Sequence, residues 1–149
     1  MSNATVGVVG AGRVGAVLAA KFRAAGHPIV GVSGRSASTR LRVQTLLPGV
    51  HTVSPIELAQ RADILILAVP DDALVEVASS LAAHARPGQV VLHTSGRHGL
   101  DVLRSFTQAG ARVIAFHPAM TFTGTEVDLA RTCAYGLSAD PENRELAEA

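Results

Sequence analysis

The sequence has no acidic side chain before Glu57 and only one cysteine, Cys133. A single cysteine excludes a disulfide framework and is typical of a reducing compartment, so we expect a cytoplasmic protein with Cys133 as a small buried hydrophobe. The net charge of +1 gives no overall field that would attract nucleic acid. Since no apolar run is long enough to span a membrane, we expect neither a nucleic-acid nor a membrane partner.

Short apolar runs alternate with helical patterns, and hydrophobic residues make up 48% of the chain, which predicts a buried core. The expected strands are residues 5–10, 28–33, 50–53, 63–70, 89–96, 112–118 and 133–138. The expected helices are 13–26, 36–49, 54–62, 71–85, 100–110 and one that Asp140 caps, that starts at Pro141 and that still runs at Ala149. Short links between such elements favour right-handed crossovers. We therefore expect residues 1–149 to form one doubly wound α/β domain with a mostly parallel sheet.

Three glycines follow the first expected strand in the spacing G-x-G-x-x-G, at Gly10, Gly12 and Gly15. Gly10 would permit a tight turn, Gly12 would let the backbone approach a pyrophosphate, and Gly15 would let the helix lie close to the strand. The anion would then sit at the positive end of the helix. The alternative is a glycine turn that binds nothing. The strand before the motif and the helix after it favour a dinucleotide site.

The end of the second expected strand lacks the carboxylate that usually accepts hydrogen bonds from the adenosine ribose of NAD. The chain offers Ser33, Gly34, Arg35 and Ser36 there, with Arg40 one turn further on. Hydroxyl and guanidinium groups suit a phosphate, so the cofactor that we expect is NADP(H). The alternative is that the arginines belong only to a solvated start of the next helix.

Polar residues also follow the later strands, whose carboxyl ends meet at one edge of a parallel sheet. Thr94 and Ser95 follow one strand, and His117 ends the next. Ser95 could bond a substrate oxygen, and His117 could supply or take the proton that accompanies hydride transfer. Alternatively, His117 fixes a turn before Pro118.

Two other chemistries are weaker readings of the same residues. His93, His98 and His117 might be taken for a metal site, but no carboxylate or cysteine joins them at ligand spacing, and we expect no metal. A serine hydrolase is disfavoured because the chain has no G-x-S-x-G motif. Val69 and Pro70, after the 63–70 strand, would face the nicotinamide, while Asp71 or Asp72 would cap the next helix.

The expected catalytic residues are thus Ser95 and His117. The expected cofactor contacts are Gly10, Ala11, Gly12, Arg13, Val14, Gly15, Ser33, Gly34, Arg35, Ser36, Val69, Pro70, Thr94 and Ser95.

Five segments together resemble a known bacterial family: VGVVGAGRVGAVLA, VSGRS, DILILAVPDDAL, LHTSGRHGL and AFHPAMTFTG. The family is that of Rossmann-like NADP-dependent oxidoreductases with a C-terminal helical domain of unknown function. It is similar to 6-phosphogluconate dehydrogenase, pyrroline-5-carboxylate reductase, ketopantoate reductase and prephenate dehydrogenase. In prephenate enzymes a serine and a His-Pro histidine serve the substrate, which the resemblance places at Ser95 and His117. This chain departs from them because no lysine follows Ser95 and because Phe122-Thr123-Gly124 lies further along.

The resemblance implies a further helical domain, which is absent from this chain and which closes the active site and often makes a homodimer. We expect an NADP-dependent dehydrogenase or reductase domain acting on a small carbonyl or hydroxy acid, which alone could bind nucleotide without turnover. The alternatives are a prephenate dehydrogenase-like enzyme and a non-catalytic NADP(H)-binding sensor or scaffold.

Overall fold

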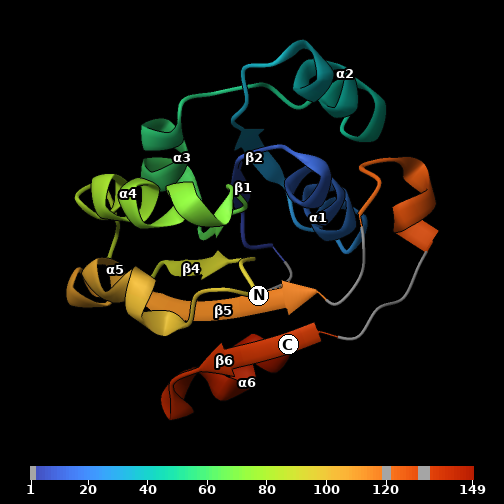
Figure 1. The fold of residues 1–149 in the computed structure, drawn as a ribbon. Coiled ribbons are helices and arrows are strands. Elements are labelled where there is room, and N and C mark those ends of the chain that lie inside the picture. Colours follow the sequence, from blue (N-terminus) through green and yellow to red (C-terminus); the bar gives the residue numbers. More distant parts are fainter. Residues whose placement is uncertain (1–2, 119–121, 131–134) are drawn as a thin grey trace.

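A computed structural model describes residues 3–118, 122–130 and 135–149 (Figure 1). The described residues form a six-stranded sheet with strand order β2-β1-β3-β4-β5-β6. Its strands are β1 (Val6–Val9), β2 (Ile29–Val32), β3 (Ile64–Leu67), β4 (Val90–His93), β5 (Arg112–Pro118) and β6 (Tyr135–Ala139). The first five are parallel, and β6 runs antiparallel to β5. The doubly wound, mostly parallel sheet expected from the sequence is confirmed.

Helices cover both faces of this sheet (Figure 1). They are α1 (Arg13–Ala24), α2 (Ala37–Leu46), α3 (Pro55–Arg61), α4 (Asp71–Ala82), α5 (Arg104–Gln108) and α6 (Arg144–Glu148), with 3-10 turns η1 (Leu100–Leu103), η2 (Glu126–Ala130) and η3 (Pro141–Asn143). In β3, Ile64 and Ile66 pack with α1 and α2, whereas Leu65 and Leu67 pack with α3, α4 and α5. Alternate residues face opposite layers, so a central strand must be apolar throughout.

The helix boundaries follow local signals in the sequence. Ser36 and Ser54 begin α2 and α3, and each hydroxyl accepts a backbone N–H three residues on. Gly26 follows α1 with a φ of +99°, which other residues rarely adopt. None of the described helices is long and apolar enough to cross a lipid bilayer.

Several local expectations were wrong. Residues 50–53 form no strand but one isolated bridge, between Val32 and Thr52. Pro48-Gly49 and Pro55 confine this segment between two helices, which leaves too little chain for a ladder. Residues 100–110 divide into the turn η1 and the short helix α5.

One predicted cap was wrong, and one predicted helix is divided. The N-cap of α4 is Pro70, and Asp71 and Asp72 lie in its first turn, where they can only favour the helix dipole. Asp140 is the N-cap before Pro141, as expected, although its side chain makes no capping bond; the expected single helix divides into η3 and α6, and the Ala149 N–H still donates to the Glu145 carbonyl at 3.1 Å. The expectation for Cys133 lies outside the described residues.

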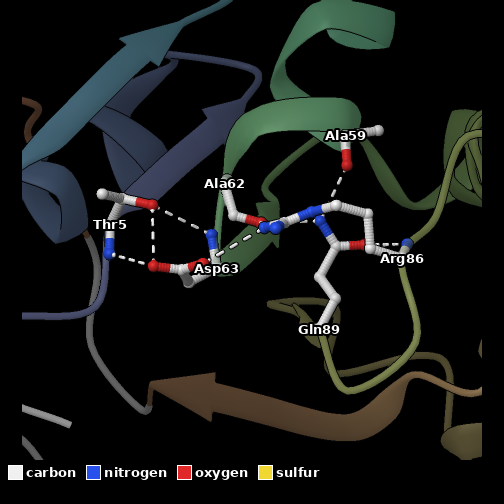
Figure 2. A network of polar contacts seen from close by, with 6 residues as sticks. All are labelled: Thr5, Ala59, Ala62, Asp63, Arg86 and Gln89. Carbon is white, nitrogen blue, oxygen red and sulfur yellow. Dashed lines mark hydrogen bonds and ion pairs between the residues drawn. The ribbon is translucent and has the colours of Figure 1, made fainter.

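A polar network joins the amino ends of the strands (Figure 2). The Asp63 carboxylate accepts hydrogen bonds from the Thr5 amide at 3.0 Å and from the Thr5 hydroxyl at 3.1 Å, and the Arg86 guanidinium donates to it at 3.2 Å. The Thr5 amide bond and, next, the Arg86 hydrogen bond lower the pKa of Asp63 below its usual value. The network ties the start of β1 to the start of β3.

Buried Gln89 extends this network toward β4 (Figure 2). Its side-chain amide donates to the carbonyl oxygens of Ala59 at 2.8 Å and Ala62 at 2.7 Å. These carbonyls belong to the end of α3, where a helix leaves acceptors without intrahelical partners. At the amino edge of the sheet, the side chains of Asp63 and Gln89 are thus engaged in bonds that support the fold.

We predict that Asp63→Asn makes stability less dependent on acid pH. A carboxylate whose pKa is lowered in the folded state adds stability above its unfolded pKa, and this stability is lost as the pH falls through the folded pKa. The Tm of the wild type should therefore fall more than that of the variant between about pH 5 and pH 2. Thermal denaturation measures it. The control is Asp101→Asn, since Asp101 has a 96% exposed side chain in its pair with Arg104. Parallel curves for all three proteins would contradict the prediction.

Candidate functional site

The three glycines of the loop after β1 have three different environments. Gly10 has a φ of +92°, and a Cβ on it would lie 2.6 Å from the Ala68 carbonyl oxygen. A Cβ on Gly15 would collide with the Gly10 carbonyl oxygen, so α1 sits directly on the turn. Around Gly12, by contrast, nothing lies within 4 Å of the Cβ position. The fold requires Gly10 and Gly15, whereas the space beside Gly12 is open to a ligand.

The residues of this loop fit a dinucleotide pyrophosphate. Gly12 is the N-cap of α1, and it offers no side-chain hydrogen bond to the first turn. Ala11 is buried, Arg13 is exposed and Val14 is half-buried. The first turn carries no acid, so the positive end of a twelve-residue helix faces the open space.

Ser33, expected among the cofactor contacts, accepts two hydrogen bonds from the glycine loop. Its hydroxyl accepts the Gly10 N–H at 2.9 Å, and its carbonyl accepts the Ala11 N–H at 2.7 Å. Ser33 is buried, and its own N–H donates to the Val8 carbonyl at 2.9 Å. The end of β2 is thus joined to the glycine loop through one serine.

In the segment after Ser33, the Arg35 side chain is exposed to solvent. Ser36 is the N-cap of α2, and Gly34 leaves room for the Thr39 side chain against the backbone. Arg40 donates to the Arg35 carbonyl at 3.3 Å. Within the described residues, the exposed Arg35 guanidinium has no hydrogen bond or ion pair of its own, so it is available to an anion.

Arg42 also reaches this region, although the sequence analysis did not select it. Its Nη1 lies 3.4 Å from the Ala11 carbonyl oxygen. A Cβ on Gly124 would lie 2.8 Å from the Arg42 Nε and 2.9 Å from the Arg13 Cγ. No pattern in the sequence around Arg42 could have identified it, because adjacent residues of a helix do not share a face.

Residues 122–130, between β5 and β6, lie beside Arg13 at Gly124. The carboxylate of Asp128, which is buried, accepts the N–H groups of Thr123 and Gly124, both at 2.9 Å. The Thr123 hydroxyl donates to the same carboxylate at 3.0 Å. Gly124 has a φ of +76°, which the tight turn requires.

The two expected catalytic residues lie at the ends of adjacent parallel strands (Figure 1). Ser95 is buried, and its hydroxyl accepts the Arg97 N–H at 3.1 Å. A Cβ on Gly96 would lie 2.7 Å from both Cε1 and Nε2 of His117. The exposed His117 imidazole therefore lies against the backbone next to Ser95, and the structure brings the two expected residues to one place.

The remaining expected residues lie nearby. Val69 is half-buried, and a Cβ on Gly10 would lie 3.2 Å from its Cγ1, so Val69 adjoins the glycine loop. Pro70 is exposed. Thr94, which follows the last residue of β4, is half-buried.

The other two histidines of this edge are held by the backbone. The Nε2 of His93 lies 2.8 Å from the Gly99 carbonyl oxygen, and the Nε2 of His98 lies 2.9 Å from the Asp71 carbonyl oxygen. Burial lowers the pKa of His93, against a smaller opposing effect of the bond to Gly99. In the described part of the chain, no group of three or more His, Cys, Asp or Glu side chains could hold a metal ion.

Comparison with known proteins places this arrangement among dehydrogenases and reductases. Over 133 residues the chain is 30% identical to glycerol-3-phosphate dehydrogenase [NAD(P)+] of Desulfitobacterium hafniense (strain Y51), covering 81% of this chain and 38% of that protein. Arogenate dehydrogenase of Synechocystis matches with a TM-score of 0.77 and 25% identity, over 97% of this chain and 54% of that one. Pyrroline-5-carboxylate reductase of Coxiella burnetii has the same fold, with a TM-score of 0.77 and 19% identity, over 98% and 54% of the two chains.

The chain spans about 38% to 54% of the length of these proteins. Residues 1–118 match the family described as Rossmann-like domain. The chain therefore belongs to the family of Rossmann-like domains.

Proposed function

We propose that this chain is the nucleotide-binding domain of an NADP(H)-dependent dehydrogenase or reductase that acts on a small carbonyl or hydroxy acid. The observation that carries the proposal is the contact of His117 with Gly96, next to Ser95, at the same sheet edge as the open Gly12 turn. A proton-transfer group and a dinucleotide cradle at one edge suit hydride chemistry.

The choice of NADP(H) over NAD(H) rests on this chain's own residues, because the name of the Desulfitobacterium relative covers both nucleotides. No carboxylate follows β2, and the Arg35 guanidinium is exposed beside the start of α2. A guanidinium attracts a 2′-phosphate, whereas a carboxylate would repel it. Arg42, close to the glycine loop, adds a second positive charge.

The site residues would orient and protonate a substrate oxygen. Because the Ser95 oxygen already accepts the Arg97 N–H, its hydroxyl hydrogen remains to be donated to that oxygen. His117 would hold or deliver the proton at the same oxygen, since an imidazole nitrogen can both accept and donate a proton. The bound nicotinamide would supply or accept the hydride.

The complete enzyme would be longer than this chain. The chain covers 54% of two of the matched structures, which supports additional chain, and we propose that this part is a helical domain that closes the site and makes a homodimer. We propose a cytoplasmic location, because the single cysteine suits a reducing compartment.

A prephenate dehydrogenase-like activity is the second candidate. It is favoured by the 25% identity to arogenate dehydrogenase over nearly the whole chain. Assays of the longer protein with arogenate, prephenate, dihydroxyacetone phosphate, ketopantoate and pyrroline-5-carboxylate would separate the candidates. NADPH binding without any turnover would instead support a sensor or scaffold.

We predict that Gly12→Ala and Gly15→Ala fail differently. Gly12→Ala should keep the fold, since the Cβ enters open space, but should weaken NADPH binding by about tenfold or more, because the methyl group occupies the pyrophosphate position. Gly15→Ala should lower the Tm, since its Cβ meets the Gly10 carbonyl oxygen. Thermal denaturation and NADPH fluorescence measure both. Unchanged NADPH affinity in a folded Gly12→Ala variant would place the dinucleotide elsewhere.

We predict that Arg35→Ala weakens NADPH binding by about tenfold to a hundredfold and leaves NADH binding nearly unchanged, because a charge-assisted hydrogen bond contributes about 1.5–3 kcal/mol. Fluorescence titration with each nucleotide measures the ratio. Arg104→Ala, which removes an exposed arginine of α5, is the matched control. Equal losses for NADPH and NADH would refute the assignment of Arg35.

We predict that His117→Ala lowers kcat of the longer enzyme by about a hundredfold or more, while NADPH affinity stays within about twofold. Ser95→Ala should also lower kcat. Steady-state kinetics on the substrate identified in the panel measures this. His84→Ala, beyond the end of α4, is the control. A kcat that neither site variant changes would remove both residues from the reaction.

A further inference from the structure

We propose that His93, the last residue of β4, is a positioning residue for the Ser95–His117 site. The inference rests on the proposed function, because it assigns His93 to the geometry of that site. His93 is fully buried, so it is not offered as a group that touches substrate. Its role would be to fix the turn on which His117 lies.

Both ring nitrogens of His93 are engaged by backbone groups. Nδ1 lies 3.1 Å from the Ser95 amide nitrogen, and Nε2 lies 2.8 Å from the Gly99 carbonyl oxygen. A backbone amide can only donate, and a carbonyl oxygen can only accept. Nδ1 must therefore be unprotonated and Nε2 must carry the hydrogen, so the two partners define one neutral tautomer.

These two bonds hold the turn at both of its ends. Ser95 begins the turn and Gly99 ends it, and the ring spans the distance between them. Inside the turn, the Arg97 N–H donates to the Ser95 hydroxyl. Near its end, the turn is joined to α4 by the bond between the His98 Nε2 and the Asp71 carbonyl oxygen. Of these four hydrogen bonds, only the one between His98 and Asp71 would still join the turn to another element if the His93 ring were removed.

The turn in turn supports His117. The Gly96 Cβ position lies 2.7 Å from two atoms of the His117 ring, so the imidazole rests on the peptide backbone at Gly96. A displacement of this backbone by a few tenths of an ångström would change that contact. His93 thus acts on His117 through Gly96, across the adjacent strands β4 and β5 (Figure 1).

The surroundings of His93 favour its neutral form. Burial is the largest cause of its lowered pKa, and the charge of His98 acts in the same direction. The bond to the Gly99 carbonyl and the charge of Asp71 oppose them. A second proton on Nδ1 would also face the Ser95 N–H, so protonation would break the bond that begins the turn.

Conservative variants can separate the two bonds. In His93→Asn, the amide oxygen can take the place of Nδ1 and accept the Ser95 N–H. In His93→Gln, the longer side chain can take the place of Nε2 and donate to the Gly99 carbonyl. His93→Leu removes both interactions at similar size. The matched control is His27→Leu, because His27 is half-buried and bonds the Ala4 carbonyl at 3.0 Å near the start of β1.

The two readouts are hydrogen exchange of the Ser95 amide and the NMR chemical shift of the His117 ring. In His93→Leu, we expect Ser95 exchange to accelerate by about tenfold and the His117 signal to move toward that of a free imidazole. His93→Asn should restore the Ser95 exchange rate, and His93→Gln should not. His27→Leu should lower the Tm and change neither readout.

The proposal is overturned if a folded His93→Leu variant keeps both readouts at their wild-type values. If that variant does not fold, wild-type His117 signals in both His93→Asn and His93→Gln overturn it instead. NADPH titration of the wild type is a separate arm. Absence of NADPH binding would refute the proposed function, whereas the two NMR readouts decide the role of His93.

Discussion

The close contact between Gly15 and Gly10 is the constraint on which the site depends. Because a Cβ on Gly15 would meet the Gly10 carbonyl oxygen, α1 begins directly on the turn that ends β1. This places the N-cap, Gly12, beside open space and lets Ser33 bond the turn from the end of β2. The pyrophosphate position that we propose beside Gly12 depends on this close approach of two backbones.

The amino edge of the sheet contributes to stability, whereas the carboxyl edge carries the proposed site. At the amino edge, the polar side chains of Asp63 and Gln89 are bonded to backbone and to neighbouring side chains (Figure 2). At the carboxyl edge, the backbone turns are fixed by buried groups such as His93 and Asp128, while Arg35 and His117 remain exposed. Buried polar groups whose partners are complete hold one conformation, so the exposed groups are presented on a defined surface.

The fold could be predicted because its signals are local or periodic. Glycine spacing, serine caps and continuous apolar strands each report on a few neighbouring residues. The errors came where tertiary geometry decides: the 50–53 segment has only one bridge with β2, and Pro70 took the capping position expected of Asp71 or Asp72. Within the site, the positions of Gly10, Ser95 and His117 followed from strand ends.

The support that these groups receive could not be predicted, because it depends on contacts far apart in sequence. Ser33 was expected to face a phosphate, and nothing in the sequence indicated that its hydroxyl also accepts the Gly10 N–H. Arg42 reaches Ala11 from α2, and no pattern around it distinguishes it from a surface arginine. A single sequence shows which groups could do chemistry. Which of them are already occupied by the backbone is decided only when the chain folds.

The positive charge around the glycine loop supports the proposed dinucleotide site, as the geometry of the loop does. Arg13, Arg35 and Arg42 come from the part of the chain that has no acid, and Arg13 and Arg42 meet beside Gly124. The one buried carboxylate nearby, Asp128, is surrounded by the donors of Thr123 and Gly124. Positive charge at a helix amino end raises the local concentration of an anion. NAD and NADP differ by one phosphate, so in the function proposed above these arginines would favour NADP(H) without any change in the fold.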